Sequence, residues 1–224
     1  PVRPTAFAIG AMAGIYDQKT KIFTPYAMGV KRSVLVGPQE QLSDVSINID
    51  IPLDTGIKVV LKDVPDAQAV GPGPNEYRVN AILDLGGEGV IRFPGGRSVF
   101  NGGKTTIMTG LAPLAFGISD ASYTIAAGAY TAGKSSPYSI RILRGVRDLS
   151  RPINVDGFLG TPRFADPPRD GTTTQRHLAI TPYGGGVAPV FWDHRLRRND
   201  NYNPVWRVIS RGSITDVPLF DLSI

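Results

Sequence analysis

The stretch Ser43–Ile51, SDVSINIDI, decides the fold class of this 224-residue chain. Apolar and polar side chains alternate strictly from Asp44 onward, and successive side chains of a strand point to opposite faces of a sheet. The two sets are the apolar Val45, Ile47, Ile49 and Ile51 and the polar Asp44, Ser46, Asn48 and Asp50. A strand with one wholly apolar side and one wholly polar side is typically half-buried. The pattern therefore predicts a strand here with one face in a core.

A hairpin is predicted just before this stretch. The run AFAIGAMAGIYD (6–17) is rich in apolar residues and ends at the turn Asp17–Thr20, and FTPYAMGVKRSVLV (23–36) follows. Two strand-like runs separated by a short polar turn indicate an antiparallel pair. No window keeps helical spacing over ten residues without Gly, Pro or a β-branched residue, so the fold class predicted is all-β.

Further strand patterns continue to the C-terminus and divide into two blocks. The first block ends near RGVRDLSRPINVDG (144–157), and a proline-broken excursion follows it. Short strands spaced roughly 8–12 residues apart are typical of sandwiches and barrels. We expect two packed antiparallel β-sandwich domains of immunoglobulin-like type, a block at 1–148 and a smaller domain at 149–224. The strand patterns expected lie at 56–65, 76–93, 105–114, 122–130, 138–145, 176–183, 186–196, 204–212 and 214–222.

Composition limits the classes of function. Hydrophobic residues make up 42% of the chain and charged residues 19%, which fits a globular protein. Cysteine is absent, which excludes disulfides, thiolate zinc sites and cysteine nucleophiles. The net charge is +5, and the basic residues after residue 135 are arginines, but carboxylates are interspersed among them. Exposed arginines that keep a β protein soluble explain this bias better than a nucleic-acid surface does.

A phosphate-loop pattern, G-x-x-x-x-G-K-[ST], occurs from Gly128 to Ser135. Such a loop needs a helix that begins at the lysine, because the helix N-terminus binds the phosphates. The residues after it, YSIRILRG (138–145), alternate with strand periodicity instead. We therefore predict a turn between two antiparallel strands, with nucleotide binding as the weaker alternative.

A second hairpin carries the candidate contact residues. FWDHRLRR (191–198) leads through the turn NDNYN into PVWRVIS (204–210), and alternation places Trp192 and His194 on one face. Arginines beside aromatic side chains are typical of polyanion and glycan sites. Loops at 64–75, 94–103 and 157–174 are further candidate contact segments. The residues selected are Trp192, Arg195, Arg197, Arg198, Tyr202, Trp206 and Arg207 in the hairpin, with Phe164 and Arg169 in the third loop.

Catalytic and metal sites are not expected. The fragment GISDA (117–121) partly matches a nucleophile elbow, but a strand pattern follows it where a helix is needed. Two histidines, His177 and His194, cannot form a three-histidine metal site. The carboxylate pairs Asp63 with Asp66 and Asp84 with Glu88 fit no calcium loop of known spacing, so we expect them in solvent. No cofactor is predicted.

The stretch AGIYDQKTKIFTPYAMGVKRSVLVGPQEQLSDVSINIDIPLD (13–54) resembles the later strands of carboxypeptidase-regulatory-like (transthyretin-like) modules. The later segments ASYTIAAGAYT, PYSIRILRGV and VWRVISRGSITDVPLFDL resemble secreted multidomain bacterial surface proteins and lipoproteins built from immunoglobulin-like sandwiches. The resemblance implies an extracytoplasmic location (secreted, cell surface or periplasmic) and a binding or structural role, with no catalytic residue. Residues 1–55 would be the end of such a module, so we expect Pro1 to mark a processing point or a fragment end.

The function expected is a non-enzymatic, exported structural or interaction module. Missing module strands leave open sheet edges, and open edges recruit other protein subunits by strand addition. The alternative is a carbohydrate- or polyanion-binding module at the Trp192–Trp206 hairpin. A third class, a nucleotide-dependent enzyme, depends on the pattern at 128–135 alone.

Overall fold

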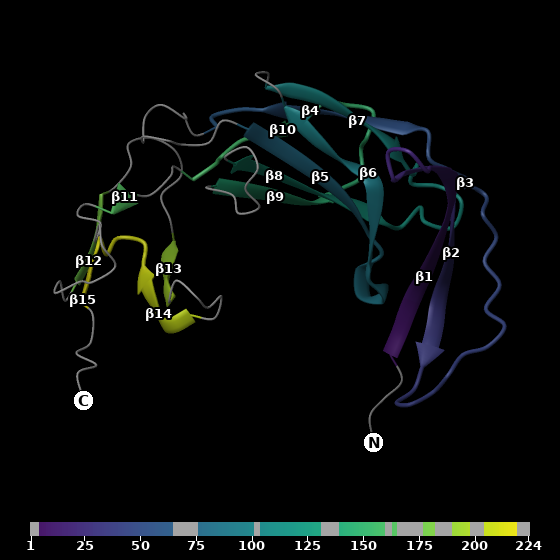
Figure 1. The fold of residues 1–224 in the computed structure, drawn as a ribbon, viewed down its shortest axis with the longest axis horizontal. Coiled ribbons are helices and arrows are strands. Elements are labelled where there is room, and N and C mark those ends of the chain that lie inside the picture. The colour runs from purple at the N-terminus through teal and green to yellow at the C-terminus, as the bar shows by residue number, and fades with distance from the viewer. Residues whose placement is uncertain are drawn as a thin grey trace. The chain divides into compact units, whose positions relative to one another are not determined.

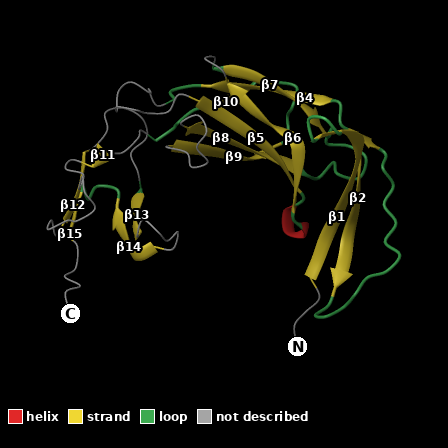
Figure 2. Ribbon diagram, viewed as in Figure 1, coloured by secondary structure: helices red, strands yellow, loops and turns green. Residues whose placement is uncertain are grey.

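A computed structural model describes residues 5–64, 76–100, 104–130, 139–159, 163–164, 177–181, 190–197 and 204–218. In the described residues nearly all of the regular secondary structure is strand, and the sheets are mainly antiparallel, as the alternation predicts. Within these ranges the helical structure is one 3₁₀ turn, η1 (Gly86–Glu88), drawn in red in Figure 2. No helix in the described part is long and apolar enough to cross a membrane.

The chain divides into two compact units. The first comprises residues 1–62 and 74–156, and the second comprises 63–73 and 157–224. The short strand β10 (Ile153–Val155) follows the boundary expected at residue 148, yet it pairs with a strand of the first unit. Residues 149–156 therefore belong to the first unit.

The body of the first unit is made of two sheets (Figure 1). In the four-stranded sheet every neighbouring pair is antiparallel. Its order is β6 (Val90–Phe100), β5 (Glu76–Asp84), β8 (Ser122–Tyr130) and β9 (Ser139–Val146). In the three-stranded sheet, β4 (Thr55–Leu61) lies antiparallel to β7 (Thr105–Leu111) and parallel to β10.

The core of the body comes from alternate residues of these strands. Pairing places Leu83 opposite Tyr123 and Ala81 opposite Ile125, and all four side chains are buried. In β4 the same period of two buries Ile57, Val59 and Leu61. The Tyr123 hydroxyl donates a hydrogen bond to the Ala112 carbonyl at 2.8 Å, so the one polar atom of this ring is satisfied.

The remaining strands of the first unit form what we call the arm, residues 5–52. The predicted hairpin is confirmed: β1 (Thr5–Asp17) pairs antiparallel with β2 (Ile22–Val36) along its whole length. The two-residue β3 (Ile51–Pro52) pairs with β2 on the side away from β1. Figure 1 shows β1 and β2 in purple and blue at the end of the body, with residues 37–50 looping out beside them.

The prediction of a strand at 43–51 is wrong for all but its last residue. Residues 37–50 form no ladder, and the strand begins only at Ile51. Val45 and Ile49, which the alternation assigns to a buried face, are 39% and 44% exposed. Periodicity reports which residues favour burial, whereas a strand also needs a neighbouring strand, and the described residues offer none here.

The described residues of the second unit form two small groups of strands. The predicted hairpin is confirmed as β13 (Phe191–Arg197) paired with β14 (Pro204–Arg211). A separate sheet has the order β11 (Arg163–Phe164), β12 (His177–Thr181) and β15 (Asp216–Pro218).

One of the predicted loops is largely a strand. Residues 94–100 of the segment 94–103 continue β6, and the register of β5 with β6 shifts between Asn80 and Ile82. A bulge of this kind admits Pro94 without loss of the sheet. The loops at 64–75 and 157–174 lie mostly outside the described residues.

Candidate interaction surface

The turn of the arm is fixed by its own carboxylate. Asp17 Oδ1 accepts the backbone N–H groups of Lys19 at 2.8 Å and Thr20 at 3.3 Å, and the Asp17 carbonyl accepts that of Lys21 at 2.8 Å. Hydrogen bonds from Thr20 and Lys19 lower the pKa of the Asp17 carboxyl below its usual range. Asp17 is therefore occupied within the turn, and Lys19 and Lys21 give the tip its positive character.

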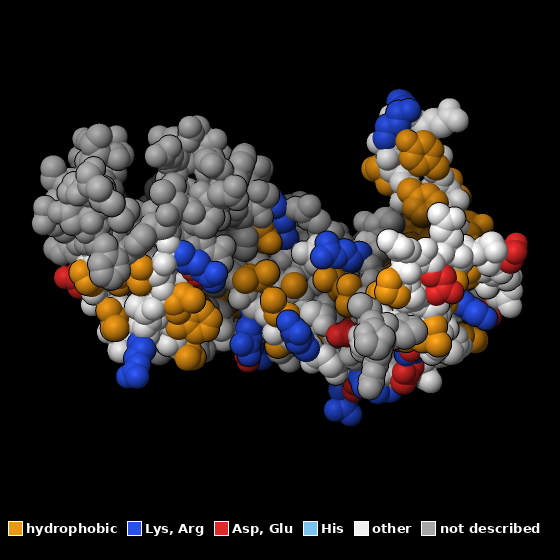
Figure 3. Space-filling view, turned by 90° about the horizontal axis from the view of Figure 1, so that it is seen from below, with side chains coloured by type: hydrophobic (Ala, Val, Ile, Leu, Met, Phe, Trp, Pro, Cys, Tyr) orange, Lys and Arg blue, Asp and Glu red, His pale blue; other side chains and the backbone are white. Residues whose placement is uncertain are grey.

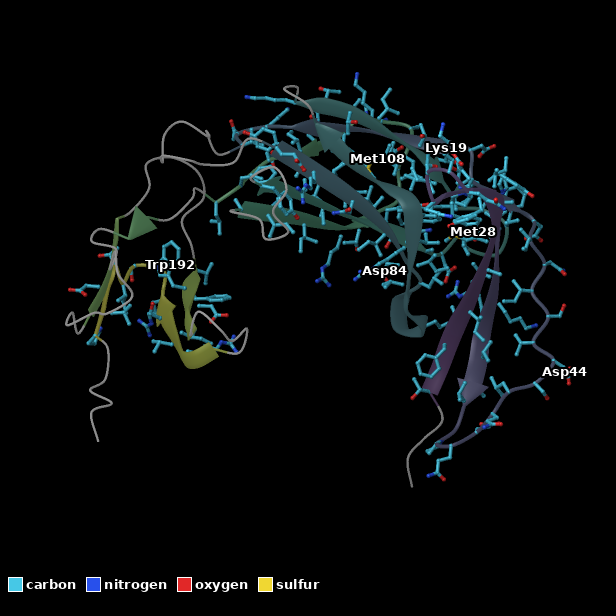
Figure 4. All side chains as sticks on the ribbon, viewed as in Figure 1. Lys19, Met28, Asp44, Asp84, Met108 and Trp192 are labelled. Atoms are coloured by element: carbon cyan, nitrogen blue, oxygen red, sulfur yellow. The ribbon has the colours of Figure 1, made fainter. Side chains whose placement is uncertain are left out.

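Apolar side chains stand exposed directly behind this turn. Ile15 is 69% exposed, Tyr16 55% and Ile22 59%. The ring of Phe23 lies over Gly14, where a Cβ atom would be 2.6 Å from it, so only glycine fits beneath the ring. In Figure 3 orange side chains lead to a projecting end capped in blue, and Figure 4 places Lys19 at that turn. These residues lie toward the turn, whereas farther along the hairpin Met28 is fully buried.

The outer edge of β1 is the longest unpaired edge among the described strands. β1 has 13 residues and pairs only with β2 in the described part of the chain. It contains no proline, no charge before Asp17 and no residue of positive φ. The two register shifts of the hairpin place their extra residues on β2, so β1 itself runs without a bulge. Natural edge strands usually carry such features to prevent pairing with other chains.

The segment 37–50 adds a second exposed apolar stretch. Leu42 is 41% exposed, close to the values of Val45 and Ile49. Near its end the backbone crosses β2, because a Cβ atom at Gly29 would lie 1.9 Å from the Asn48 carbonyl oxygen. Figure 4 shows Asp44 on the outlying part of this segment. The arm therefore has a well-formed outer strand and an apolar segment without a ladder.

One arginine ties the arm to the body. Arg32 of β2 donates from Nε to Glu88 Oε2 at 2.8 Å and from Nη1 to Asp120 Oδ1 at 2.8 Å. Glu88 also accepts the Ser33 backbone N–H at 3.0 Å. Ser33 has φ of +56° at the bulge of β2, and this bulge turns Arg32 and Ser33 toward η1. We call Arg32, Ser33, Glu88 and Asp120 the clamp.

The clamp is electrostatically matched. The guanidinium of Arg32 lowers the pKa of both carboxyls, Glu88 and Asp120, below their usual ranges, chiefly through its hydrogen bonds. The same contacts raise the pKa of Arg32 above its ordinary value. Its members lie 56 and 88 residues apart in sequence, so no local motif indicates them. The prediction that Asp84 and Glu88 lie in solvent is wrong, because both are half-buried: Glu88 belongs to the clamp and Asp84 accepts the Gly86 N–H at 2.8 Å.

The β13–β14 hairpin divides the predicted contact residues between two faces. Register puts Trp192 opposite Ser210 and Trp206 opposite Leu196, whereas Arg195 lies opposite Arg207. Residues that are directly opposite each other lie on the same face of a hairpin. The tryptophan positions are therefore on one face and the arginine positions on the other. The Trp192 indole N–H donates to the Gly212 carbonyl at 3.1 Å; Figure 4 labels this residue.

Arg207 is already paired with a carboxylate. Its Nε and Nη2 donate to Asp193 Oδ1 and Oδ2 at 2.8 and 3.0 Å, a bidentate geometry. On the same face Phe191 and Ile209 are each 62% exposed, and Arg211 is exposed. The aromatic side chain beside the described arginines is therefore Phe191.

The other predicted contact residues are only partly covered by the structure. Arg195 and Arg197 lie on β13, and Phe164 lies on β11 opposite Ile180. Arg198, Tyr202 and Arg169 lie outside the described residues.

The phosphate-loop pattern coincides with a hairpin, as predicted. Gly128 is inside β8, paired with Arg78 on one side and Ile140 on the other. Strand β9 begins at Ser139 and runs antiparallel to β8, while 131–138 lie outside the described residues. Next to Gly128 the Arg78 guanidinium lies 4.4 Å from the centre of the Tyr130 ring and forms an ion pair with Glu76. Arg78 therefore already contacts a ring and a carboxylate.

The GISDA fragment also lacks the geometry of a nucleophile elbow. Residues 117–121 form turns between β7 and β8, and β8 begins at Ser122 where a helix would be needed. In the described part of the chain no three His, Asp or Glu residues are grouped so as to hold a metal ion. The most distinctive arrangement in the described residues is therefore the exposed arm.

Comparisons with known proteins found no matching family model, no matching curated protein and no matching solved structure.

Proposed function

We propose that this chain is a non-enzymatic, exported structural or interaction module that assembles with other protein subunits through strand edges. The observation that carries the proposal is the outer edge of β1, which spans 13 residues without a proline, bulge or internal charge. Backbone N–H and C=O groups along such an edge can pair with a strand from another chain.

The clamp supports this role because it presents the edge in a fixed position. A two-stranded hairpin on its own is marginally stable in water. Arg32 joins β2 to η1 and to the loop at Asp120, and these ion pairs add to the packing of the buried Met28. A partner then meets an ordered edge and less conformational entropy is lost on binding.

The proposal also includes the type of β-sandwich, the location of the protein and the loops that would contact a partner. We infer that the two sheets of the body form an immunoglobulin-like sandwich and that the second unit is a smaller one. Location outside the cytoplasm follows from the resemblance of 13–54 to regulatory-like modules of secreted proteins. Loops 64–75 and 157–174, with Phe164 and Arg169, would add contacts beside the strand edge.

Native assembly is the first test. Electron microscopy and intact mass of the natively isolated chain should show ordered assemblies or a firmly bound second polypeptide. A clean monomer of 24.0 kDa would overturn the proposal.

Lysine substitutions on the two strands of the hairpin then test the edge itself. Phe7→Lys with Ile15→Lys places two charges on β1, where both side chains are already exposed. Ile22→Lys with Leu35→Lys places the same charges on β2 at similarly exposed positions. Assembly should be lost in the β1 variant and kept in the β2 variant, because only β1 presents the pairing edge. Equal behaviour of the two variants would count against the β1 edge.

A second candidate is a polyanion- or glycan-binding module. It is favoured by the exposed Phe191 and Ile209 beside Arg207 and Arg211 on one face of the β13–β14 hairpin. Arginine and aromatic side chains together suit sulfated or phosphorylated polymers. Asp193→Asn should then raise the salt needed to elute the chain from heparin, since it frees Arg207 and removes a negative charge. Arg211→Gln should lower it, and unchanged elution of both variants would reject this face.

A further inference from the structure

The segment 44–50 has the sequence of a strand, but no described strand pairs with it. Its apolar and polar residues alternate strictly, yet no residue before Ile51 belongs to a ladder. Val45 and Ile49 leave 39% and 44% of their surface in water. A segment with this pattern gains from pairing, because a ladder would satisfy its backbone and cover one apolar face.

Strand β2 does not receive this segment. Continuing the β2–β3 register would place Ile49 opposite Val30 and Ile47 opposite Arg32. The backbone of Asn48 instead crosses β2 at Gly29, and the ladder stops. Farther along, the bulge at Arg32 and Ser33 interrupts the edge of β2 and commits both residues to Glu88.

A second copy of the chain supplies a fitting acceptor. The outer edge of β1 is regular and uncharged, and it lies on the other side of β2 from β3. A copy can therefore offer β1 to one neighbour and its segment 44–50 to another.

The distribution of charge also favours a second copy of the chain as the partner of β1. The segment 37–50 carries Glu40, Asp44 and Asp50 and no basic residue, whereas the turn beside β1 exposes Lys19 and Lys21. The acid of that turn, Asp17, is occupied by its own backbone contacts. An acidic segment and a basic tip attract each other between copies.

We propose that residues 44–50 of one copy add as a strand to the outer edge of β1 in the next copy. The contact is heterologous, so repetition closes a ring or extends a filament. This inference rests on the proposed assembly function and makes it specific, since it names both the partner and the segment that changes conformation.

The test compares two double variants of the whole chain. Val45→Lys with Ile49→Lys places charge on the apolar face of the segment, and Ser46→Lys with Asn48→Lys places the same charge on its polar face. All four positions are exposed, so both variants should fold. Sedimentation velocity over a concentration series measures self-association, and hydrogen exchange measures protection of amides 44–50.

The wild-type chain should associate with rising concentration, and its amides 44–50 should become protected as it does so. Val45→Lys with Ile49→Lys should weaken association about a hundredfold, since two apolar side chains lose their cover. The Ser46→Lys, Asn48→Lys control should associate more strongly than that variant.

Three results would overturn the inference. They are a monomer at every concentration, equal association of both variants, and protection of 44–50 that does not depend on concentration, which would mean pairing within one chain. The edge proposal would survive each of them if β1 still bound a different polypeptide in the native isolate. The two proposals therefore fail separately.

Discussion

The body and the arm of the first unit are built from the same kind of sequence with opposite outcomes. In β4 the alternate residues Ile57 and Val59 are fully buried, whereas in the arm Ile15 and Leu35 are 69% and 61% exposed. The body strands have a second sheet against their apolar faces, whereas in the hairpin only the middle is covered, where Met28 is fully buried and Ile91 lies over Gly10. An alternating strand pattern therefore specifies a face that favours burial, while the partner for that face can lie outside the monomer.

The largest effect is expected from shortening one leucine in the body and comparing the loss of stability with that of a leucine in the arm. Leu83→Ala in the body should lower the free energy of unfolding by about 2–5 kcal/mol, because it leaves a cavity in a packed core. Leu35→Ala in the arm should change it by less than about 0.5 kcal/mol, because that side chain is already in water. Urea denaturation of both variants measures the difference, and equal losses would mean that the arm is covered in solution.

A smaller effect is expected from one buried hydroxyl of the body. Tyr123→Phe removes the hydrogen bond to the Ala112 carbonyl and leaves that acceptor unpaired, which should cost about 1 kcal/mol. Burial raises the pKa of the Tyr123 phenol above its ordinary value, so this hydroxyl should stay protonated while the chain is folded. Urea denaturation of Tyr123→Phe beside the wild type tests the bond, and no loss of stability would show that it contributes nothing.

The clamp predicts a pH effect confined to the arm. Glu88 and Asp120 have pKa values lowered by Arg32 in the folded chain, so their contribution is present above the unfolded pKa of about 4 and is lost as pH falls through the lowered values. Amides of β1 and β2 should exchange faster below about pH 4, relative to intrinsic rates, while those of β5 and β8 stay protected.

Arg32→Gln is the control for that pH effect. It should give the fast exchange of the arm already at neutral pH and remove most of the further change on acidification. A pH response that is undiminished in Arg32→Gln would show that other carboxyls produce it.

No effect at all is expected from adding a nucleotide to the chain. The comparison assigns the body a framework role, and the phosphate-loop pattern at 128–135 belongs to the body. Millimolar Mg-ATP should leave the thermal midpoint unchanged, because a ligand that does not bind the folded state does not stabilise it. A rise in the midpoint would break the assignment and return attention to the β8–β9 hairpin.

Sequence reasoning predicts the local pairs of this fold better than its distant contacts. The β1–β2, β8–β9 and β13–β14 hairpins are predicted from strand-like runs separated by turn residues in the sequence. The stretch at 43–51 has the clearest pattern but fails, because alternation carries no information on whether a neighbour is available. The clamp also escapes prediction, since Arg32, Glu88 and Asp120 approach one another only after three separate segments have folded.

The parallel pairing of β10 with β4 has a consequence for the time course of folding. Ile153 pairs with Val59, so the three-stranded sheet joins segments from the two ends of the body. Contacts of such large sequence separation raise the contact order and slow folding, because chain entropy is lost before they form. During synthesis the first unit cannot complete this sheet until residue 155 has emerged. A chain that leaves the ribosome should therefore keep this sheet incomplete until late in synthesis.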